Sequence, residues 1–271
     1  MRRGFKYGLF IGFVSLFYAC EKVIDIPLND AEVQTVIEGV LNDAEGNNYI
    51  LLSKTTTVYA QSDFPTISGA SVVVTDSHGS TFVFEEVDTV PGRYTAPELT
   101  VQPETTYMLE VNIDGAVFTA ESYAHKTPKI DSITTVQQDF GFSEFLGYIP
   151  HTVYFHSFDD GAVKNFYRFK ISVNNRESSL LYIGNDEFIN GQYFSAPFLG
   201  DLTTEDDSVE IVMHACDQAY YNYLFSFSNA SGGGGPFTAA PGNPVSNIQG
   251  EKGIGYFTAL TTDTLTHVVG Q

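Results

Sequence analysis

The feature that most constrains the fold is the alternation of inward and outward side chains through the first half of the chain. Every second residue between positions 107 and 113 is apolar: Tyr107, Leu109, Val111 and Ile113. This period of two is typical of a strand with one buried face. Asp114-Gly115 follows, and this dipeptide favours the positive φ angles of a tight hairpin turn. The pattern predicts two antiparallel neighbours, over residues 107–113 and 116–123.

Similar runs, with turn residues between them, occupy residues 33–41, 49–54, 71–75, 81–85 and 92–95. Seven short strands within about 90 residues indicate an immunoglobulin-like β-sandwich. A transthyretin-like sandwich is equally compatible with this pattern. We therefore expect one sandwich domain over residues 31–126.

Thr127-Pro128 predicts a domain boundary, because proline cannot donate to a central ladder and favours an extended residue before it. A second β-rich domain is expected over residues 127–271. Its strand candidates are residues 130–138, 151–158, 166–173, 208–214, 254–260 and 265–269. The predicted fold class is thus mainly β in both parts.

One short α-helix is expected in the second domain, over about residues 217–229. Its apolar residues recur at helical spacing and should face the sheet: Tyr220, Tyr223, Leu224 and Phe227. Asp217 is placed to cap the N-terminus. Tyr221 and Phe225 lie off this stripe, so they either pack under the loop that follows or contact a ligand or partner.

A Gly/Pro-rich loop follows the helix, at about residues 231–247. Loops of this length without secondary structure are usually functional or disordered. No Lys-Ser or Lys-Thr follows the glycines, so a phosphate-binding loop is a poor interpretation. Either the loop is ordered and covers the domain, or it is mobile and contacts a partner through residues such as Gly233 and Gly234.

The N-terminus has the three parts of a lipoprotein signal. Basic residues precede an apolar segment that ends directly before Cys20. That segment is shorter than the roughly 20 apolar residues that span a bilayer. We expect residues 1–19 to be removed, Cys20 to carry a lipid anchor, and residues 20–30 to form a tether. The alternative is a plain signal peptide cleaved elsewhere, with Cys20 as an ordinary thiol.

Loss of the signal would also make the chain more acidic. Without Arg2, Arg3 and Lys6 it keeps 10 Lys and Arg against 33 Asp and Glu, a formal charge of −23. Such a field repels phosphate backbones, which argues against nucleic-acid binding. It suits a soluble domain at a crowded surface, or the attraction of cationic peptides or divalent ions. Cys216 is then the only remaining thiol, so no intramolecular disulfide can form.

Segments in order along the chain resemble one family: Cys20–Ile26, Val36–Gly39, Ser68–Val74, Asp131–Ile133, Asn165–Phe169, Ala219–Tyr223, and Asn247–Gly250 with Gly255–Phe257. The chain is similar to the Bacteroidota lipoproteins described as domain of unknown function 4249. The resemblance implies an outer-membrane lipoprotein, commonly encoded beside TonB-dependent receptors that import glycans or peptides, and it implies no catalytic residues. Glu21 and Asp25 fit loosely the acidic pattern that, in that phylum, favours the cell surface over the periplasmic face.

Sequence motifs for catalysis are missing. The six histidines include no His-Glu-x-x-His spacing, and no Gly-x-Ser-x-Gly occurs. His151 and His156 lie five residues apart on a predicted strand, which places them on opposite faces. Cys216 follows His214 by two residues, but this position is more typical of a small buried residue than of a thiolate nucleophile. We expect neither enzyme activity nor a cofactor.

Two acidic loop clusters are weak candidates for calcium, which prefers such oxygen donors. They are Asp159-Asp160 and Asp206-Asp207. Neither shows the alternating Asp-x-Asp-x-Asp-Gly spacing of a dedicated site, so solvated turns explain them more simply.

The sequence favours a binding role. The leading hypothesis is a non-catalytic outer-membrane lipoprotein that assists a TonB-dependent receptor in nutrient uptake, by holding a peptide or glycan or by completing the receptor complex. The alternative is a structural or adhesion-like surface lipoprotein with no transport role. The candidate contacts are Tyr221, Phe225, Gly233 and Gly234.

Overall fold

The computed structural model describes residues 32–44, 48–56, 64–138, 141, 145, 147–232 and 242–270. The chain forms two units, Met1–Glu32 and Val33–Gln271, and all elements described below belong to the second. The predicted signal peptide, Cys20, the tether, Gly233 and Gly234 lie outside the described residues. No described helix is long and apolar enough to cross a membrane.

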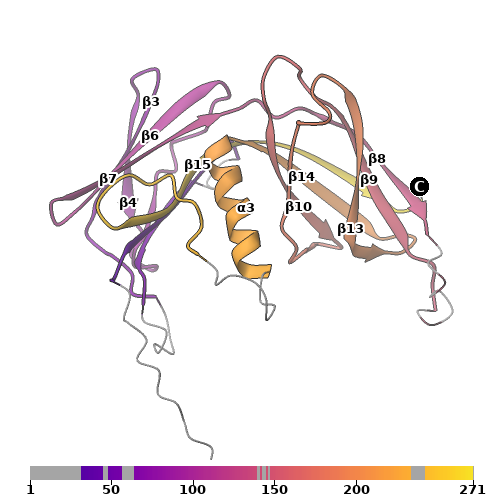
Figure 1. Cartoon of the computed structure of the whole chain (residues 1–271), viewed down its shortest axis with the longest axis horizontal. Coiled ribbons are helices and arrows are strands. Elements are labelled where there is room, and N and C mark those ends of the chain that lie inside the picture. Colours follow the sequence, from indigo (N-terminus) through magenta and orange to yellow (C-terminus); the bar gives the residue numbers. More distant parts are fainter. Residues whose placement is uncertain are drawn as a thin grey trace, which may run out of the picture. The chain divides into compact units, whose positions relative to one another are not determined.

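The protein is mainly β, as predicted (Figure 1). The first half contributes β1 (Thr35–Asn42), β2 (Tyr49–Lys54), β3 (Ser71–Asp76), β4 (Thr81–Glu86), β5 (Arg93–Thr95), β6 (Thr105–Ile113) and β7 (Ala116–Ala124). They are neighbours in one sheet in the order β1-β2-β5-β4-β3-β6-β7. All seven strands predicted for this half are present. Asp114 and Gly115 have φ angles of 52° and 90°, which confirms the predicted tight turn between β6 and β7.

The second half extends this sheet and adds another. It contributes β8 (Ile130–Gln137), β9 (His151–Phe158), β10 (Phe166–Val173), β11 (Arg176–Glu177), β12 (Tyr182–Asn185), β13 (Tyr193–Thr203), β14 (Ser208–Cys216), α3 (Gln218–Gly232) and β15 (Gly253–Val268). The order β11-β10-β14-β15 continues into β1, with β12 also on β10, and β13-β9-β8 form a separate three-stranded sheet. The sequence did not predict β11, β12 or β13. Pro197 within β13 conceals that strand, and it is tolerated because β13 pairs with a neighbour on one side, β9.

The last two predicted strands are wrong as separate elements, because β15 is one continuous strand. Its first half pairs in parallel with β1, from Thr35↔Gly253 to Asn42↔Leu260. Its second half pairs antiparallel with β14, from Thr261↔Ala215 onward. The sequence prediction ended one strand at residue 260 and began the next at 265, yet the threonines between them are β-branched and suit a strand. The backbone ladder therefore crosses the predicted boundary at residue 127, and independent folding of the two parts stays a prediction.

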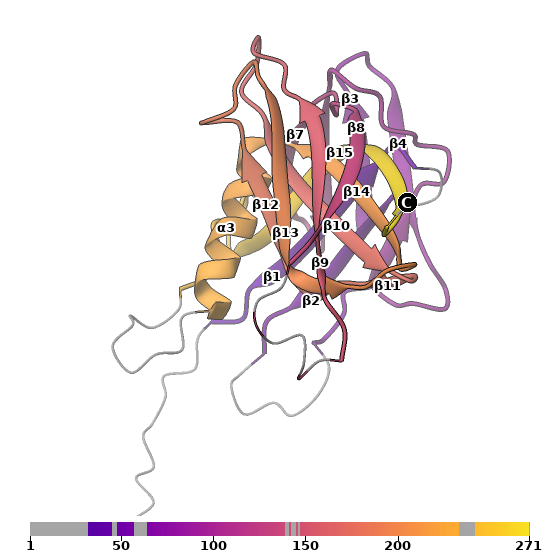
Figure 2. The ribbon, with the colours of Figure 1, turned by 90° about the vertical axis from the view of Figure 1, so that its right-hand side faces the viewer.

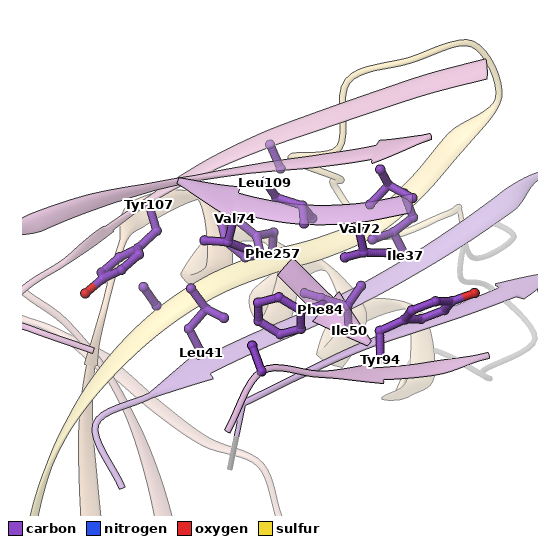
Figure 3. Close-up of a cluster of buried hydrophobic side chains, with 14 of the residues drawn as sticks. Ile37, Leu41, Ile50, Val72, Val74, Phe84, Tyr94, Tyr107, Leu109 and Phe257 are labelled. Atoms are coloured by element: carbon purple, nitrogen blue, oxygen red, sulfur yellow. The ribbon is translucent and has the colours of Figure 1, made fainter. Parts of the chain in front are cut away.

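The core of the first half lies between β3, β6 and β7 on one side and β1, β2 and β15 on the other. Figure 3 shows the apolar side chains of these strands facing one another. Tyr107, Leu109 and Val111 are buried in this core, as the alternation predicted. The immunoglobulin-like or transthyretin-like arrangement of the strands stays a prediction.

A second core lies between the three-stranded sheet and the β10-β14 part of the large sheet (Figure 2). Phe155 of β9 contacts Phe169 of β10 and Phe198 of β13, with ring centroids 4.9 and 5.3 Å apart. Successive side chains of a strand point to opposite faces. The residues of β10 and β14 that alternate with this core therefore point to the other face of the large sheet.

Candidate binding site

Helix α3 lies on the face of the large sheet opposite the second core. Arg168 of β10 and His214 of β14 are cross-strand neighbours on it, whereas Phe169 and Met213 enter the second core. Helix α3 packs beside β10, β12 and β15 (Figure 1). A third apolar cluster joins the helix to the sheet: Tyr220, Leu224, Phe166, Cys216 and Leu260. The predicted stripe thus faces the sheet at Tyr220 and Leu224, but the prediction is wrong for Phe227, which is 46% exposed.

The start of α3 is fixed by Asp217, as predicted. Its Oδ1 accepts a hydrogen bond of 2.8 Å from the backbone N–H of Tyr220. Its Oδ2 accepts one from the hydroxyl of Ser122 on β7, and the Ser122 oxygen accepts the N–H of Ala259 on β15, at 2.9 Å. Burial raises the pKa of Asp217, and these hydrogen bonds oppose that rise. The cap therefore ties the helix to strands of both halves.

Four aromatic residues of α3 form two stacks, one on the side of β10 and β12 and one on the side of β15, which together we call the aromatic ridge: Tyr221, Tyr223, Phe225 and Phe227. Each phenylalanine stacks on the tyrosine four residues before it, at centroid distances of 6.2 and 6.4 Å. The tyrosines in turn contact the sheet side, Tyr221 on Phe166 at 5.0 Å and Tyr223 on Tyr256 at 4.7 Å. The outer members, Phe225 and Phe227, are 54% and 46% exposed. The ridge therefore presents two apolar rings to solvent on a firm base.

Of the predicted contact residues, Phe225 is thus exposed, and Tyr221 is half-buried beneath it. The Tyr221 hydroxyl also accepts a hydrogen bond of 3.3 Å from the Asn185 amide. Both remain candidate contacts, with different roles: Phe225 as the surface and Tyr221 as its support.

Beside Tyr220 and Tyr256, the same face holds a cavity of about 480 Å³ that we call the basic cavity. Its charged and titratable lining is cationic or neutral: Arg93, Arg168, Lys170 and His214, with Tyr49 and Tyr256. These residues come from five strands, β2, β5, β10, β14 and β15. No lining residue is an aspartate or glutamate, although the chain as a whole has a formal charge of −20.

The cations of this cavity are weakly compensated. Nη1 of Arg168 donates a hydrogen bond of 2.8 Å to the Tyr220 hydroxyl, and its Nε is buried without an acceptor among the described residues. The Arg93 guanidinium lies 4.6 Å from the centre of the Tyr49 ring, a cation–π contact. Lys170 pairs with Glu177 at 3.4 Å on the exposed side.

Burial, with the charges of Arg168 and Lys170, lowers the pKa of His214 to about 4, so the ring is neutral at pH 7. Its Nδ1 lies 3.1 Å from the Thr262 hydroxyl. Burial also raises the pKa of Tyr220 to about 12. The cavity therefore offers fixed positive charge, protonated phenols and a neutral imidazole of low basicity.

Cys216 is not placed as a nucleophile. It is fully buried and free, as the sequence predicted for a small packed residue. Burial, with the charge of Asp217 adding to it, raises the pKa of its thiol well above the usual value, so the thiolate is disfavoured at neutral pH.

Three of the four calcium candidates, Asp159, Asp160 and Asp207, accept hydrogen bonds from protein donors. Asp159 is buried and accepts hydrogen bonds from the Tyr167 hydroxyl at 2.6 Å and from the N–H of Gly191 at 3.0 Å. Asp207 accepts the N–H of Thr204 at 2.7 Å. Asp160 and Asp206 lie in the adjoining turns. Among the described residues, no three His, Cys, Asp or Glu side chains are grouped to hold a metal.

The sequence reasoning missed the basic cavity. Arg93 lies far in sequence from Arg168 and Lys170, and only the arrangement of strands in the large sheet places all three on one cavity. A signal did exist, since Arg168 and Lys170 alternate with buried residues on a predicted strand and must share its other face.

The fold and this face define a mainly β protein whose continuous sheet carries one helix and, next to it, a basic cavity. The family model for a domain of unknown function, DUF4249, matches residues 21–266. The chain therefore belongs to that family, as its sequence segments indicated. No curated protein matches it.

Proposed function

We propose that the protein is a non-catalytic lipoprotein of the outer membrane that assists a TonB-dependent receptor in nutrient uptake. Lipid on Cys20 anchors the chain, the cell surface is its favoured location, and the face around α3 contacts the receptor or its peptide or glycan substrate. Membership of DUF4249 supports the proposal, because the resemblance to that family implies an outer-membrane lipoprotein commonly encoded beside TonB-dependent receptors.

The aromatic ridge is the observation that carries the binding role. Phe225 and Phe227 are exposed, and each is held by a stacked tyrosine that packs against the sheet side. Exposed aromatic residues on rigid supports are typical of binding hot spots, because little side-chain entropy is lost when they are covered.

Co-purification tests the receptor partnership. A C-terminal affinity tag is added to the native gene, membranes are solubilised in mild detergent, and the captured proteins are identified by mass spectrometry. We expect a TonB-dependent barrel among them, with its recovery reduced at least tenfold by the double variant Phe225→Ser/Phe227→Ser. The matched control is Phe158→Ser, because Phe158 of β9 is 56% exposed on the three-stranded sheet.

Recovery of this protein without any barrel would overturn the receptor partnership. A deletion strain that loses surface attachment but keeps nutrient uptake would instead favour the adhesion-like alternative. The lipid anchor is checked separately by the intact mass of the native N-terminus, which should begin at an acylated Cys20. An unacylated chain that begins elsewhere would contradict it.

A further inference from the structure

We propose that the basic cavity binds a small ligand carrying one carboxylate on a hydroxylated body. This inference rests on the binding role proposed above and adds the chemistry of the ligand. It concerns residues beside the aromatic ridge rather than the ridge itself.

The basic cavity is positively charged, whereas the chain as a whole is strongly negative. Arg93, Arg168 and Lys170 line one cavity, and none of its lining residues is acidic. In a chain with 33 Asp and Glu against 13 Lys and Arg, acidic residues would normally compensate such a cluster. Lys170 pairs with Glu177, but no carboxylate among the described residues pairs with Arg93 or Arg168, so these two guanidinium groups are available to an anionic ligand.

Arg168 leaves one hydrogen bond unmade among the described residues. Nε of Arg168 is buried and has no acceptor in the described part of the chain, and Nη1 of the same guanidinium donates to the Tyr220 hydroxyl. Leaving a buried donor unpaired is costly, so such a group calls for an explanation. Nε is closed to the cavity in this rotamer, so the Arg168 side chain must turn before a ligand carboxylate accepts from Nε and a second guanidinium nitrogen, whose fork matches the two carboxylate oxygens.

Two carboxyl groups near the cavity favour a ligand with one negative charge rather than two. Asp43 lies between the lining residues Asn42 and Ala44, and its Oδ2 accepts the N–H of Thr262 at 2.9 Å. Glu38 of β1 is the register partner of the lining residue Tyr256 of β15. Partial burial raises the pKa of Glu38. These carboxyl groups, and the acidic chain as a whole, repel a dianion more strongly than a monoanion. They offset part of the attraction that the three cations exert on a second negative charge, and we therefore assign the ligand a single carboxylate.

The uncharged lining of the cavity indicates the chemistry of the rest of the ligand. Thr262, Thr264 and Asn42 offer hydroxyl and amide groups, and Tyr49 and Tyr256 offer rings. This mixture suits a body with several hydroxyl groups and an apolar face. The volume of about 480 Å³ lies within the range of small-molecule sites, roughly 300–1,000 Å³.

Calorimetric titration of the full-length protein in detergent, at physiological salt, tests the assignment. Glucuronate and N-acetylneuraminate are compared with glucose and glucose 6-phosphate. We expect at least one carboxylate sugar to bind at least tenfold more tightly than glucose, and more tightly than glucose 6-phosphate. Arg168→Gln and Arg93→Gln should each weaken that binding at least tenfold. Arg176→Gln, an exposed arginine on β11 outside the cavity, should change it less than twofold.

The assignment is overturned if neither carboxylate sugar binds better than glucose, if glucose 6-phosphate binds best, or if Arg176→Gln weakens binding as much as Arg168→Gln. Circular dichroism checks that each variant is folded. If Arg168→Gln does not fold, the binding measured for Arg93→Gln tests the assignment instead. Recovery of the receptor without carboxylate binding would remove this inference and leave the proposed function. Carboxylate binding without recovery of a receptor would remove the proposed receptor partnership and leave this inference.

Discussion

Burial sets the protonation state of His214. The ring lies on the face of β14 beside Arg168 and Lys170, and its pKa falls from 6.5 to about 4. The folded protein therefore binds this proton less readily than the unfolded chain does. The stability that neutral His214 contributes is complete above pH 6.5 and is lost as the pH falls through 4.

We expect the free energy of unfolding of the wild type to fall by about 3 kcal/mol from this group between pH 6.5 and 4, since one pKa unit corresponds to about 1.4 kcal/mol. Urea titrations at pH 7, 5.5 and 4 measure it. His214→Gln should lose less stability over this range. His78→Gln, at an exposed turn, should follow the wild type. Equal slopes for all three proteins would contradict the burial argument.

Asp217 joins the cap of α3 to Ser122 of β7. Asp217→Ala removes the N-cap acceptor and leaves the Ser122 hydroxyl without its acceptor, so the free energy of unfolding should fall by about 2–3 kcal/mol. Asp217→Asn keeps a cap and should cost less than about 1 kcal/mol at pH 7. The folded pKa of Asp217 is raised, so its contribution is greatest below pH 3.8 and declines above it, which favours Asn further as the pH rises. Equal losses for Ala and Asn at pH 7 would show that the cap matters little.

At the scale of elements, β15 depends on the close approach of its first half to β1. Gly255 has a φ of +117°, and a Cβ there would lie 2.0 Å from the carbonyl oxygen of Ile37. That oxygen belongs to the neighbouring backbone, so it cannot move without disturbing the parallel ladder. Glycine is therefore required at this position by both conformation and space.

Gly255→Ala should lower the free energy of unfolding by about 3 kcal/mol or more, because strained backbone alone costs roughly 1–3 kcal/mol and the clash adds to it. Gly79→Ala is the matched control, since Gly79 has a φ of +93° and open space around its Cβ. It should cost about 1 kcal/mol. Thermal and urea unfolding compare the two. Similar losses would mean that conformation rather than the contact with β1 sets the requirement.

Elements governed by local pattern could be predicted, and those governed by distant pairing could not. The turn at Asp114-Gly115 and the cap at Asp217 depend on residues within a few positions. The continuity of β15 depends on β1 and β14, which lie far away in the sequence. The same holds for the binding site, because Arg93 and Arg168 are 75 positions apart in the sequence and line one cavity only through the fold of the sheet. Phe225 could be placed on α3 in advance, but its exposure could not.

At the scale of the molecule, β15 makes the two halves share one ladder. Leu52→Ala weakens the first core and Ile211→Ala the second. Each should lower the free energy of unfolding by about 2–5 kcal/mol, and each should leave a single transition in which circular dichroism and tyrosine fluorescence coincide. A second transition in either variant would instead support two independent domains divided near residue 127.

Photo-crosslinking from the face around α3 shows whether that face contacts a receptor in cells. p-Benzoylphenylalanine replaces Phe225 in cells, with replacement of Phe158 as the control on the opposite sheet. We expect a light-dependent product between position 225 and a TonB-dependent barrel, and none from position 158. Equal crosslinking from both positions, or no barrel at position 225, would contradict it.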